Sequence, residues 1–413
     1  MRTISLFLLF ALACSSALAG FPQTVLLDYD TYTDVGGDPA DYLYSPPERS
    51  AIVDTLNDKF AAYPVTFTNT APSSGPYSTV FFNKGLSFGE IDFQNKKMSD
   101  IAELHAPKLL EVAGIPLGTA TPSEVVQTSI NIGAHETLHI LGTRHHDAFL
   151  PIGAGVSPGT GGTDWDPAYT GPEDAFLTGM EFNSLSTSVG GFSAATILDP
   201  DLFIGPRSAV KLLHDTFVDL DVDSDDENDI FTPQLLPLKT IPLPNPLPPG
   251  TPFADFELFA DVAIVEDASI EMHLDSAGDP MHPESDYYAI DAAAGDFITV
   301  EVISALGSDD FLDTALAILD PLSGFAPVPW WASSAVNDNE RESSDSLLLD
   351  VEIPFDGSYI VEVYTPFGSL EPLGDYEMLV YRLRAEAVPE PATLLLALLG
   401  LTLLACRRRR TCG

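Results

Sequence analysis

Residues 121–146 read TPSEVVQTSINIGAHETLHILGTRHH, and this stretch decides the fold of the N-terminal half of the chain. Thr121 is a favourable N-cap, Pro122 suits the first position of a helix, and Glu124 completes a capping box with the threonine. Gly142 follows the last apolar residues and can adopt the left-handed conformation that ends many helices. The stretch therefore predicts a helix that begins at Pro122 and stops at Gly142.

Three histidines of this stretch have the spacing of metal ligands. His135 and His139 are four residues apart, so a helix projects both from one face. A turn at Gly142 lets His145 swing back as a third ligand, and three neutral imidazoles with one open position are typical of a catalytic zinc site. Glu136, beside the first ligand, could take a proton from a metal-bound water. The alternative interpretations are histidines that only cap the helix end, or a zinc site without activity.

The pattern HExxHxxGxxH of residues 135–145 resembles the zinc-binding motif of the metzincin clan of zinc metallopeptidases. The resemblance implies an α+β catalytic domain in which the three histidines bind zinc and Glu136 is the general base of peptide hydrolysis. It implies a protein or peptide substrate and zinc as the cofactor.

A methionine in a turn beneath the metal is a further feature of that clan. Met180 lies 35 residues after His145 and is the candidate, although an ordinary apolar loop residue is the other interpretation. Several members carry a tyrosine two residues later, where this chain has Phe182, so tyrosine assistance to the oxyanion is not expected. His146 could compete for the third ligand position, but the family spacing favours His145. Asp147 is interpreted as an acid that supports the ligands.

The residues before this motif alternate between strand and helix patterns. Apolar or alternating runs predict strands at Val25–Tyr29, Val65–Thr70 and Thr79–Asn83, and the spacing of apolar residues predicts a helix over Pro47–Tyr63. Thr79–Asn83 is the candidate edge strand that would pair with an extended substrate.

The C-terminal region, roughly Phe253–Ala385, has a period-two pattern. Ile298, Val300 and Val302 alternate with polar residues, which predicts antiparallel strands of an all-β sandwich. The order of a DYY strand, an Ala-Gly turn, an Asp-Thr strand, Asn-Asp-Asn and two Gly-x-Tyr strands resembles the bacterial pre-peptidase C-terminal domain, a jelly-roll-like module of secreted peptidases.

Charge excludes one class of partner. The chain has 18 lysines and arginines against 61 aspartates and glutamates, a formal net charge of −43, which repels a nucleic-acid backbone. Acidic residues also offer oxygen ligands for calcium. The acidic run of residues 219–229 has alternate aspartates, as calcium loops do, but lacks the glycine of an EF-hand, so a calcium loop and a solvated linker are both open interpretations of it. For the acidic residues and asparagines of the C-terminal region, the alternative to calcium binding is that they are polar residues that form turns. The calcium candidates are Asp221, Asp223, Asp225, Asp313, Asp320, Asn337 and Asp338.

Both ends of the chain have the character of targeting segments. Residues 1–19 combine a charged start, an apolar run and a small-residue cleavage site, as secretory signal peptides do. At the other end, Val388–Pro391 (VPEP) precedes an apolar segment and the cluster Arg407–Arg410. This end resembles the PEP-CTERM sorting tag of exosortase systems, with a plain membrane anchor as the alternative. The resemblance implies a bacterial protein exported to the surface or medium, with exosortase-type machinery as a partner and membrane contact only through the tag.

The sequence thus predicts five consecutive segments. In chain order they are a signal peptide (1–19), an α+β metzincin-like catalytic domain (20–232), a proline-rich linker (233–252), a pre-peptidase C-terminal-like β-sandwich (253–385) and a PEP-CTERM sorting tag (386–413). The expected function is that of a secreted or surface-sorted zinc endopeptidase. The alternative is a surface or matrix-binding protein with a structural, inactive zinc site, which would have no use for Glu136.

Overall fold

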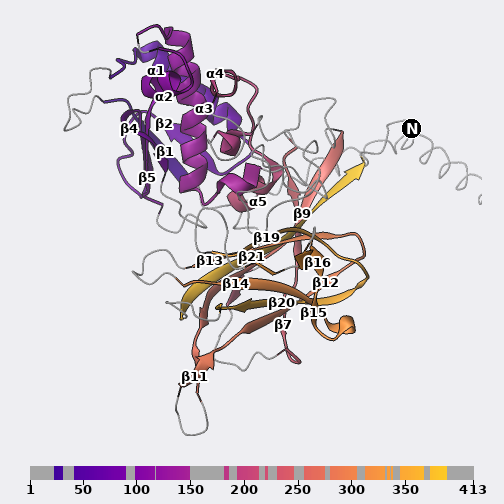
Figure 1. Ribbon diagram of the computed structural model, residues 1–413. Coiled ribbons are helices and arrows are strands. Elements are labelled where there is room, and N and C mark those ends of the chain that lie inside the picture. The colour runs from indigo at the N-terminus through magenta and orange to yellow at the C-terminus, as the bar shows by residue number, and fades with distance from the viewer. Residues whose placement is uncertain are drawn as a thin grey trace, which may run out of the picture.

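The computed structural model describes residues 23–30, 41–89, 98–116, 118–148, 181–185, 193–213, 219–221, 230–245, 255–274, 280–304, 312–330, 333–334, 336–337, 345–366 and 373–387. The signal peptide of residues 1–19 and almost all of the predicted tag lie outside these ranges. Figure 1 shows an N-terminal unit of helices and strands above a C-terminal unit built of strands. The chain is therefore of mixed α/β content with a large β component.

A five-stranded sheet forms the base of the N-terminal unit. Its strand order is β2-β1-β3-β5-β4, in which β4 runs antiparallel to β5 and the other neighbours are parallel. Alternate residues of β1, among them Val25 and Leu27, are buried, which matches the apolar run that predicted this strand. The strands are β1 (Gln23–Asp28), β2 (Val65–Thr68), β3 (Ser78–Phe81), β4 (Asn83–Gly89) and β5 (Ile101–His105).

The prediction of an edge strand at Thr79–Asn83 is wrong. Most of that segment is β3, which pairs with β1 on one side and β5 on the other. Val80 and Phe82 are completely buried there, as suits a strand inside the sheet. The chain starts a new strand at Asn83, and this β4 is the sheet's last strand beside β5.

Helix α3 (Pro122–Ile140) crosses this sheet and begins as the sequence predicts (Figure 1). The Thr121 hydroxyl accepts from the Glu124 amide, and the Glu124 carboxylate accepts from the Thr121 amide at 2.6 Å. Gly142 has φ +88°, the left-handed conformation expected just after the helix. Gly133 lets α3 approach closely, because a Cβ there would lie 3.4 Å from the Phe82 ring.

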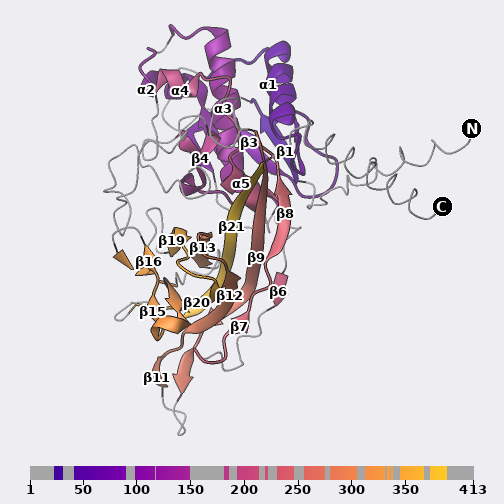
Figure 2. The ribbon, with the colours of Figure 1, turned by 90° about the vertical axis from the view of Figure 1, so that its right-hand side faces the viewer.

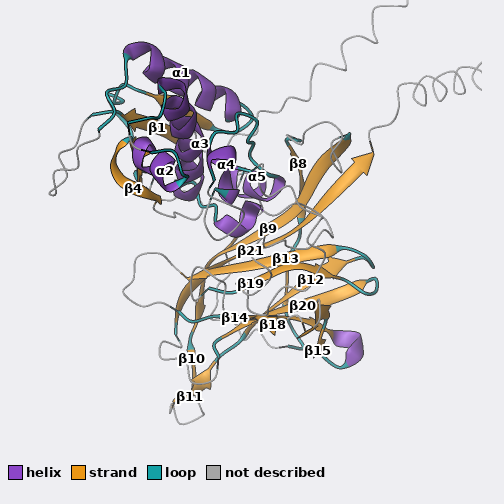
Figure 3. Cartoon of the chain, turned by 45° about the horizontal axis from the view of Figure 1, so that its top comes forward, coloured by secondary structure: helices purple, strands orange, loops and turns teal. Residues whose placement is uncertain are grey.

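The other helical segments of the described residues are short, apart from α1. Figure 3 shows that nearly all of them gather in the N-terminal unit. They are α1 (Pro46–Lys59), α2 (Ala106–Val112), α4 (Ala194–Ile197) and α5 (Pro206–Leu212), with 3-10 turns η2 (His145–Ala148), η5 (Phe182–Ser184) and η7 (Pro321–Ser323).

The C-terminal unit consists of two six-stranded sheets that pack face to face, as the alternating pattern predicts. One sheet has the order β15-β14-β20-β12-β7, with β18 beside β14. The other has the order β19-β13-β21-β9-β6, with β8 beside β9. Their strands are β6 (Asp219–Asp221), β7 (Gln234–Leu235), β8 (Lys239–Leu243), β9 (Phe256–Ile270), β12 (Asp286–Ala292), β13 (Phe297–Ser304), β14 (Ala315–Asp320), β15 (Ala326–Pro327), β18 (Val336–Asn337), β19 (Leu347–Glu352), β20 (Gly357–Tyr364) and β21 (Gly374–Ala387). Two further hairpins pair β10 (Met272–Leu274) with β11 (Pro280–Pro283) and β16 (Pro329–Trp330) with β17 (Ser333–Ser334).

The proline-rich segment 233–252 is not a spacer over its described residues, which corrects the prediction. β7 adds to one sheet and β8 to the other, where Pro242 lies opposite Phe259 of β9. Proline is tolerated because β8 is on the edge of its sheet and needs no amide on its open side. Residues 219–221 already pair with β9, so the sandwich also begins before residue 232.

One hydrophobic core runs through both units. It includes Ile132 of α3, Val210 of α5, and Ala260 and Val262 of β9. Figure 2 shows β8, β9 and β21 reaching up to the N-terminal unit. The outer face of the β19-β13-β21 sheet is therefore covered by protein, and Glu301 of β13 is only 1% exposed there.

Candidate metal centre

Helix α3 and the turn after it bring three histidines to one point. His135 and His139 lie one helical turn apart, and their Nε2 atoms are 3.2 Å from each other. The chain turns at Gly142, and the Nε2 atom of His145 comes within 3.2 Å of that of His139. The ligand atoms of all three residues lie within 4.8 Å of one another, so the spacing read from the sequence corresponds to a cluster in space.

Backbone carbonyls fix which nitrogen of two of these rings is protonated. His135 Nδ1 lies 2.8 Å from the Phe182 carbonyl, and His139 Nδ1 lies 2.9 Å from the Thr143 carbonyl. A carbonyl only accepts hydrogen bonds, so each Nδ1 must carry the proton. Each Nε2 is then an acceptor that points at the other, which is the arrangement of metal-binding histidines whose second nitrogen is held by the protein.

The surroundings of His135 favour its neutral form. His135 and His139 are 4% and 6% exposed. Burial, together with the neighbouring His139 and His145, holds the pKa of His135 well below its usual range, so its imidazole is neutral at pH 7. Two nitrogens at 2.0–2.1 Å from a tetrahedral zinc ion are about 3.3 Å apart. The observed 3.2 Å separations are close to this spacing.

Glu136 follows the first histidine on α3 and is 2% exposed, so a carboxyl group lies in the same buried part of the helix as the ligands. Met180, the predicted turn methionine, lies outside the described residues. Phe182, two residues later, is completely buried and contributes its carbonyl to His135. The sequence does not reveal this contact, because any residue at position 182 would offer the same backbone carbonyl.

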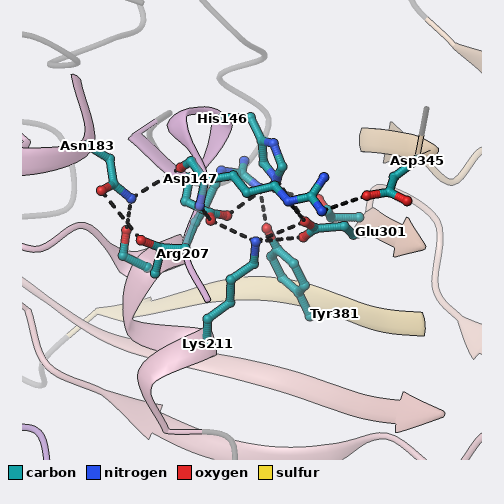
Figure 4. A network of polar contacts seen from close by, with 12 residues as sticks. His146, Asp147, Asn183, Arg207, Lys211, Glu301, Asp345 and Tyr381 are labelled. Carbon is teal, nitrogen blue, oxygen red and sulfur yellow. Dashed lines mark hydrogen bonds and ion pairs between the residues drawn. The ribbon is translucent and has the colours of Figure 1, made fainter. Parts of the chain in front are cut away.

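A second group of potential ligands combines His146 and Asp147, which directly follow His145 in the sequence, with the distant Glu301. His146 Nε2 is 3.4 Å from Glu301 Oε1 and 3.6 Å from Asp147 Oδ1, and all three residues are buried. The Lys211 ammonium already fills the cation position, at 2.7 Å from Asp147 and 2.8 Å from Glu301 (Figure 4). His146 therefore faces this charged group and is not part of the three-histidine cluster, whose third member is His145.

The second group belongs to a network of buried charges that joins the two units (Figure 4). Arg144, which precedes His145 in the sequence, reaches Asp345 of the sandwich at 2.6 Å. Arg207 of α5 reaches Asp350 of β19 at 2.6 Å. These pairs and the Lys211–Glu301 contact connect residues at least 90 positions apart, so local sequence patterns could not reveal them.

The calcium candidates do not form a cluster in the described part of the chain. The Asp320 carboxylate accepts from the Leu322 amide at 2.8 Å and so caps a turn. No group of three His, Cys, Asp or Glu ligand atoms forms around Asp313 or Asp320 among the described residues. Asp221 lies in β6 and Asn337 in β18. Asp223, Asp225 and Asp338 lie outside the described residues.

Comparison with known proteins identifies the C-terminal tag. Residues 387–410 match the PEP-CTERM protein-sorting motif, so this end of the chain carries that motif. The motif indicates an exported, surface-sorted bacterial protein and its recognition by exosortase-type machinery. No helix within the described ranges is long and apolar enough to cross a membrane.

Two solved structures share limited similarity with the chain. One is PliG from Aeromonas hydrophila, a periplasmic inhibitor of g-type lysozyme. It is 16% identical, and the match covers 30% of this chain and 86% of the inhibitor, with a TM-score of 0.19. Another is the pre-peptidase C-terminal domain of collagenase from Bacillus anthracis. It is 14% identical, and the match covers 28% of this chain and 89% of that domain, with a TM-score of 0.18. TM-scores this low establish neither a shared fold nor a shared activity. No curated protein matches the sequence.

Proposed function

We propose that the chain is an exported zinc-dependent endopeptidase of metzincin type. The observation that carries the proposal is the convergence of His135, His139 and His145, with Nε2 separations of 3.2 Å and two of the three Nδ1 atoms held by carbonyls. Three protein ligands leave a fourth position for water or substrate, as in catalytic rather than structural zinc sites. The PEP-CTERM motif agrees with a site of action outside the cytoplasm.

The residues divide the work of peptide hydrolysis between them. The three histidines would hold a zinc ion, which would supply Lewis-acid activation of a water molecule and of the scissile carbonyl. The Glu136 carboxylate accepts the proton of the attacking water and delivers it to the leaving amine nitrogen. The Phe182 and Thr143 carbonyls keep two of the imidazoles in the tautomer that can bind metal.

The backbone of β4 offers a place for an extended peptide. β4 packs against α3 and is the last strand of its sheet among the described residues. A substrate could extend the sheet there by backbone hydrogen bonds, as peptides do at open sheet edges. This assigns to β4 the role that sequence analysis gave to Thr79–Asn83.

The substitution Glu136→Gln tests the proposal. The glutamine has the same shape but cannot accept a proton, so cleavage of an unfolded protein substrate should fall about 10²- to 10⁴-fold at equal zinc content. Glu124→Gln on the same helix is the matched control, because glutamine also completes a capping box and activity should persist. Equal cleavage by wild type and Glu136→Gln would refute the role of Glu136. Zinc binding without cleavage by the wild type would favour a structural zinc site.

A further inference from the structure

The turn that carries His145 is held in place by side chains from outside the metal cluster. The Asp147 carboxylate accepts from the Arg144 amide at 2.8 Å and so closes the turn around His145. Asn183 donates to the Arg144 carbonyl at 3.2 Å. Asp147 is completely buried, so this closing contact is shielded from water.

The position of Asp147 depends in turn on the β-sandwich. Its Oδ2 atom lies 2.7 Å from the Lys211 ammonium, and Lys211 lies 2.8 and 3.0 Å from the two oxygens of Glu301. Glu301 projects from β13, so the chain of contacts runs from the sandwich through α5 to the turn of His145 (Figure 4). Each of these side chains is at most 3% exposed, so solvent screening is weak.

We infer that Glu301 is a positioning residue of the metal centre: it acts through Lys211 and Asp147 to hold His145 where it can bind the ion. The inference rests on the proposed zinc site and goes beyond it, because it makes the sandwich part of that site. The metal centre then needs the sandwich, because His145 keeps its position only while Glu301 of β13 supplies its carboxylate.

The same helix provides a matched control for this inference. Arg207 lies one helical turn before Lys211 on α5 and pairs with Asp350 of β19 at 2.6 Å. Arg207 also donates to Thr299 and Tyr381 of the sandwich, both at 3.2 Å. Arg207 and Asp350 are both buried and join the same two units as Lys211 and Glu301 do. None of the Arg207 contacts named in this paragraph involves a residue of the turn that carries His145.

The experiment compares Glu301→Gln with Asp350→Asn in the full chain. Zinc affinity is measured by competition with a chromophoric chelator, and Co²⁺ absorption reports the geometry of the ligands. Glu301→Gln should weaken zinc binding about 10-fold or more, as loss of a group that orients metal ligands commonly does, and should alter the cobalt spectrum. Asp350→Asn should lower the melting temperature but leave both metal readouts within about threefold of wild type. If Glu301→Gln does not fold, the double variant Lys211→Met/Glu301→Gln, which removes both charges of the pair, is measured in place of the single variant.

Each outcome decides a different question. Equal zinc affinity and cobalt spectra for the two variants would overturn the inference, because the network would then only join the units. The same holds if Asp350→Asn weakens zinc as much as Glu301→Gln. Failure of the wild type itself to take up zinc or cobalt would overturn the proposed function and this inference with it. A wild type that binds zinc but cleaves nothing leaves the comparison of the two variants as decisive as before.

Discussion

Two groups of potential metal ligands include neighbouring residues of the sequence, His145 in one and His146 and Asp147 in the other, and they differ in the contacts that surround them. In the group of His146, Asp147 and Glu301, a lysine ammonium stands among the carboxylates, so the protein supplies its own cation. In the group of His135, His139 and His145, two Nε2–Nε2 separations are 3.2 Å, and backbone carbonyls hold the Nδ1 atoms of His135 and His139. The comparison teaches that clustering of ligand residues alone does not identify a metal site. Lys211 supplies the cation of the group that contains Glu301, whereas zinc is the cation that we propose for the three histidines.

The largest expected effect comes from removing the internal cation. Lys211→Met leaves Asp147 and Glu301 buried without their ammonium, which should lower the free energy of unfolding by about 3–5 kcal/mol. His139→Ala, compared in metal-free protein, removes the hydrogen bond to the Thr143 carbonyl and should cost about 1–3 kcal/mol. Urea unfolding with a chelator present measures both. Equal losses would contradict the distinction between the two groups.

Asp286, a buried carboxyl with no ion pair among the described residues, provides a second test of charge compensation. Burial raises the pKa of Asp286 to about 7, although the Tyr376 hydroxyl donates a hydrogen bond to it. Burial also opposes ionisation of Glu301, but the Lys211 ammonium holds the pKa of Glu301 below its usual range. The two carboxyls should therefore affect stability with opposite dependence on pH.

For Asp286 the folded-state pKa exceeds the unfolded value of 3.8, so its contribution to stability is complete below pH 3.8 and is lost as the pH rises through 7. The loss is at most roughly 4 kcal/mol, from a shift of about three units at 1.36 kcal/mol each. Asp286→Asn should flatten this fall between pH 4 and 8 in thermal unfolding. Asp291→Asn, at an exposed position of the same strand, should leave it unchanged. An unaltered pH profile for Asp286→Asn would mean that the group is solvated.

The smallest expected effect separates the stability of α3 from the geometry of its ligands. Thr121→Ala removes the N-cap that accepts from the Glu124 amide and should cost about 1 kcal/mol. The cap is more than three turns from His135, so zinc affinity should stay within about threefold of wild type. A large loss of zinc binding would show that the start of the helix controls the ligands.

Local signals were sufficient to predict the elements that carry the cluster. The capping box, the spacing of His135 and His139, and the turn at Gly142 each depend on residues within one or two helical turns. The sandwich followed from alternation along its strands. These patterns depend on the neighbours of each residue in the sequence, which is why they could be read without the structure.

Long-range packing explains what the sequence did not reveal. Thr299 and Glu301 alternate with apolar residues on β13, as solvent-facing positions do, yet both are 1% exposed because the N-terminal unit covers that face. The proline-rich segment resembled a spacer, but Pro242 fits an edge strand whose partner β9 is distant in sequence. Exposure of a strand face and pairing of an edge are both decided by which unit packs against which, and neither has a local pattern.

The central claim is that the three histidines form a zinc site and that His145, rather than its neighbour, is the third ligand. The most direct test is the zinc content of wild type, His145→Ala and His146→Ala, measured by elemental analysis after dialysis against a weak chelator. We expect about one zinc per chain in wild type and in folded His146→Ala, and little in His145→Ala, because loss of a ligand should exceed the 10- to 100-fold cost of losing a supporting group. Full zinc content in His145→Ala, or none in the wild type, would contradict the account.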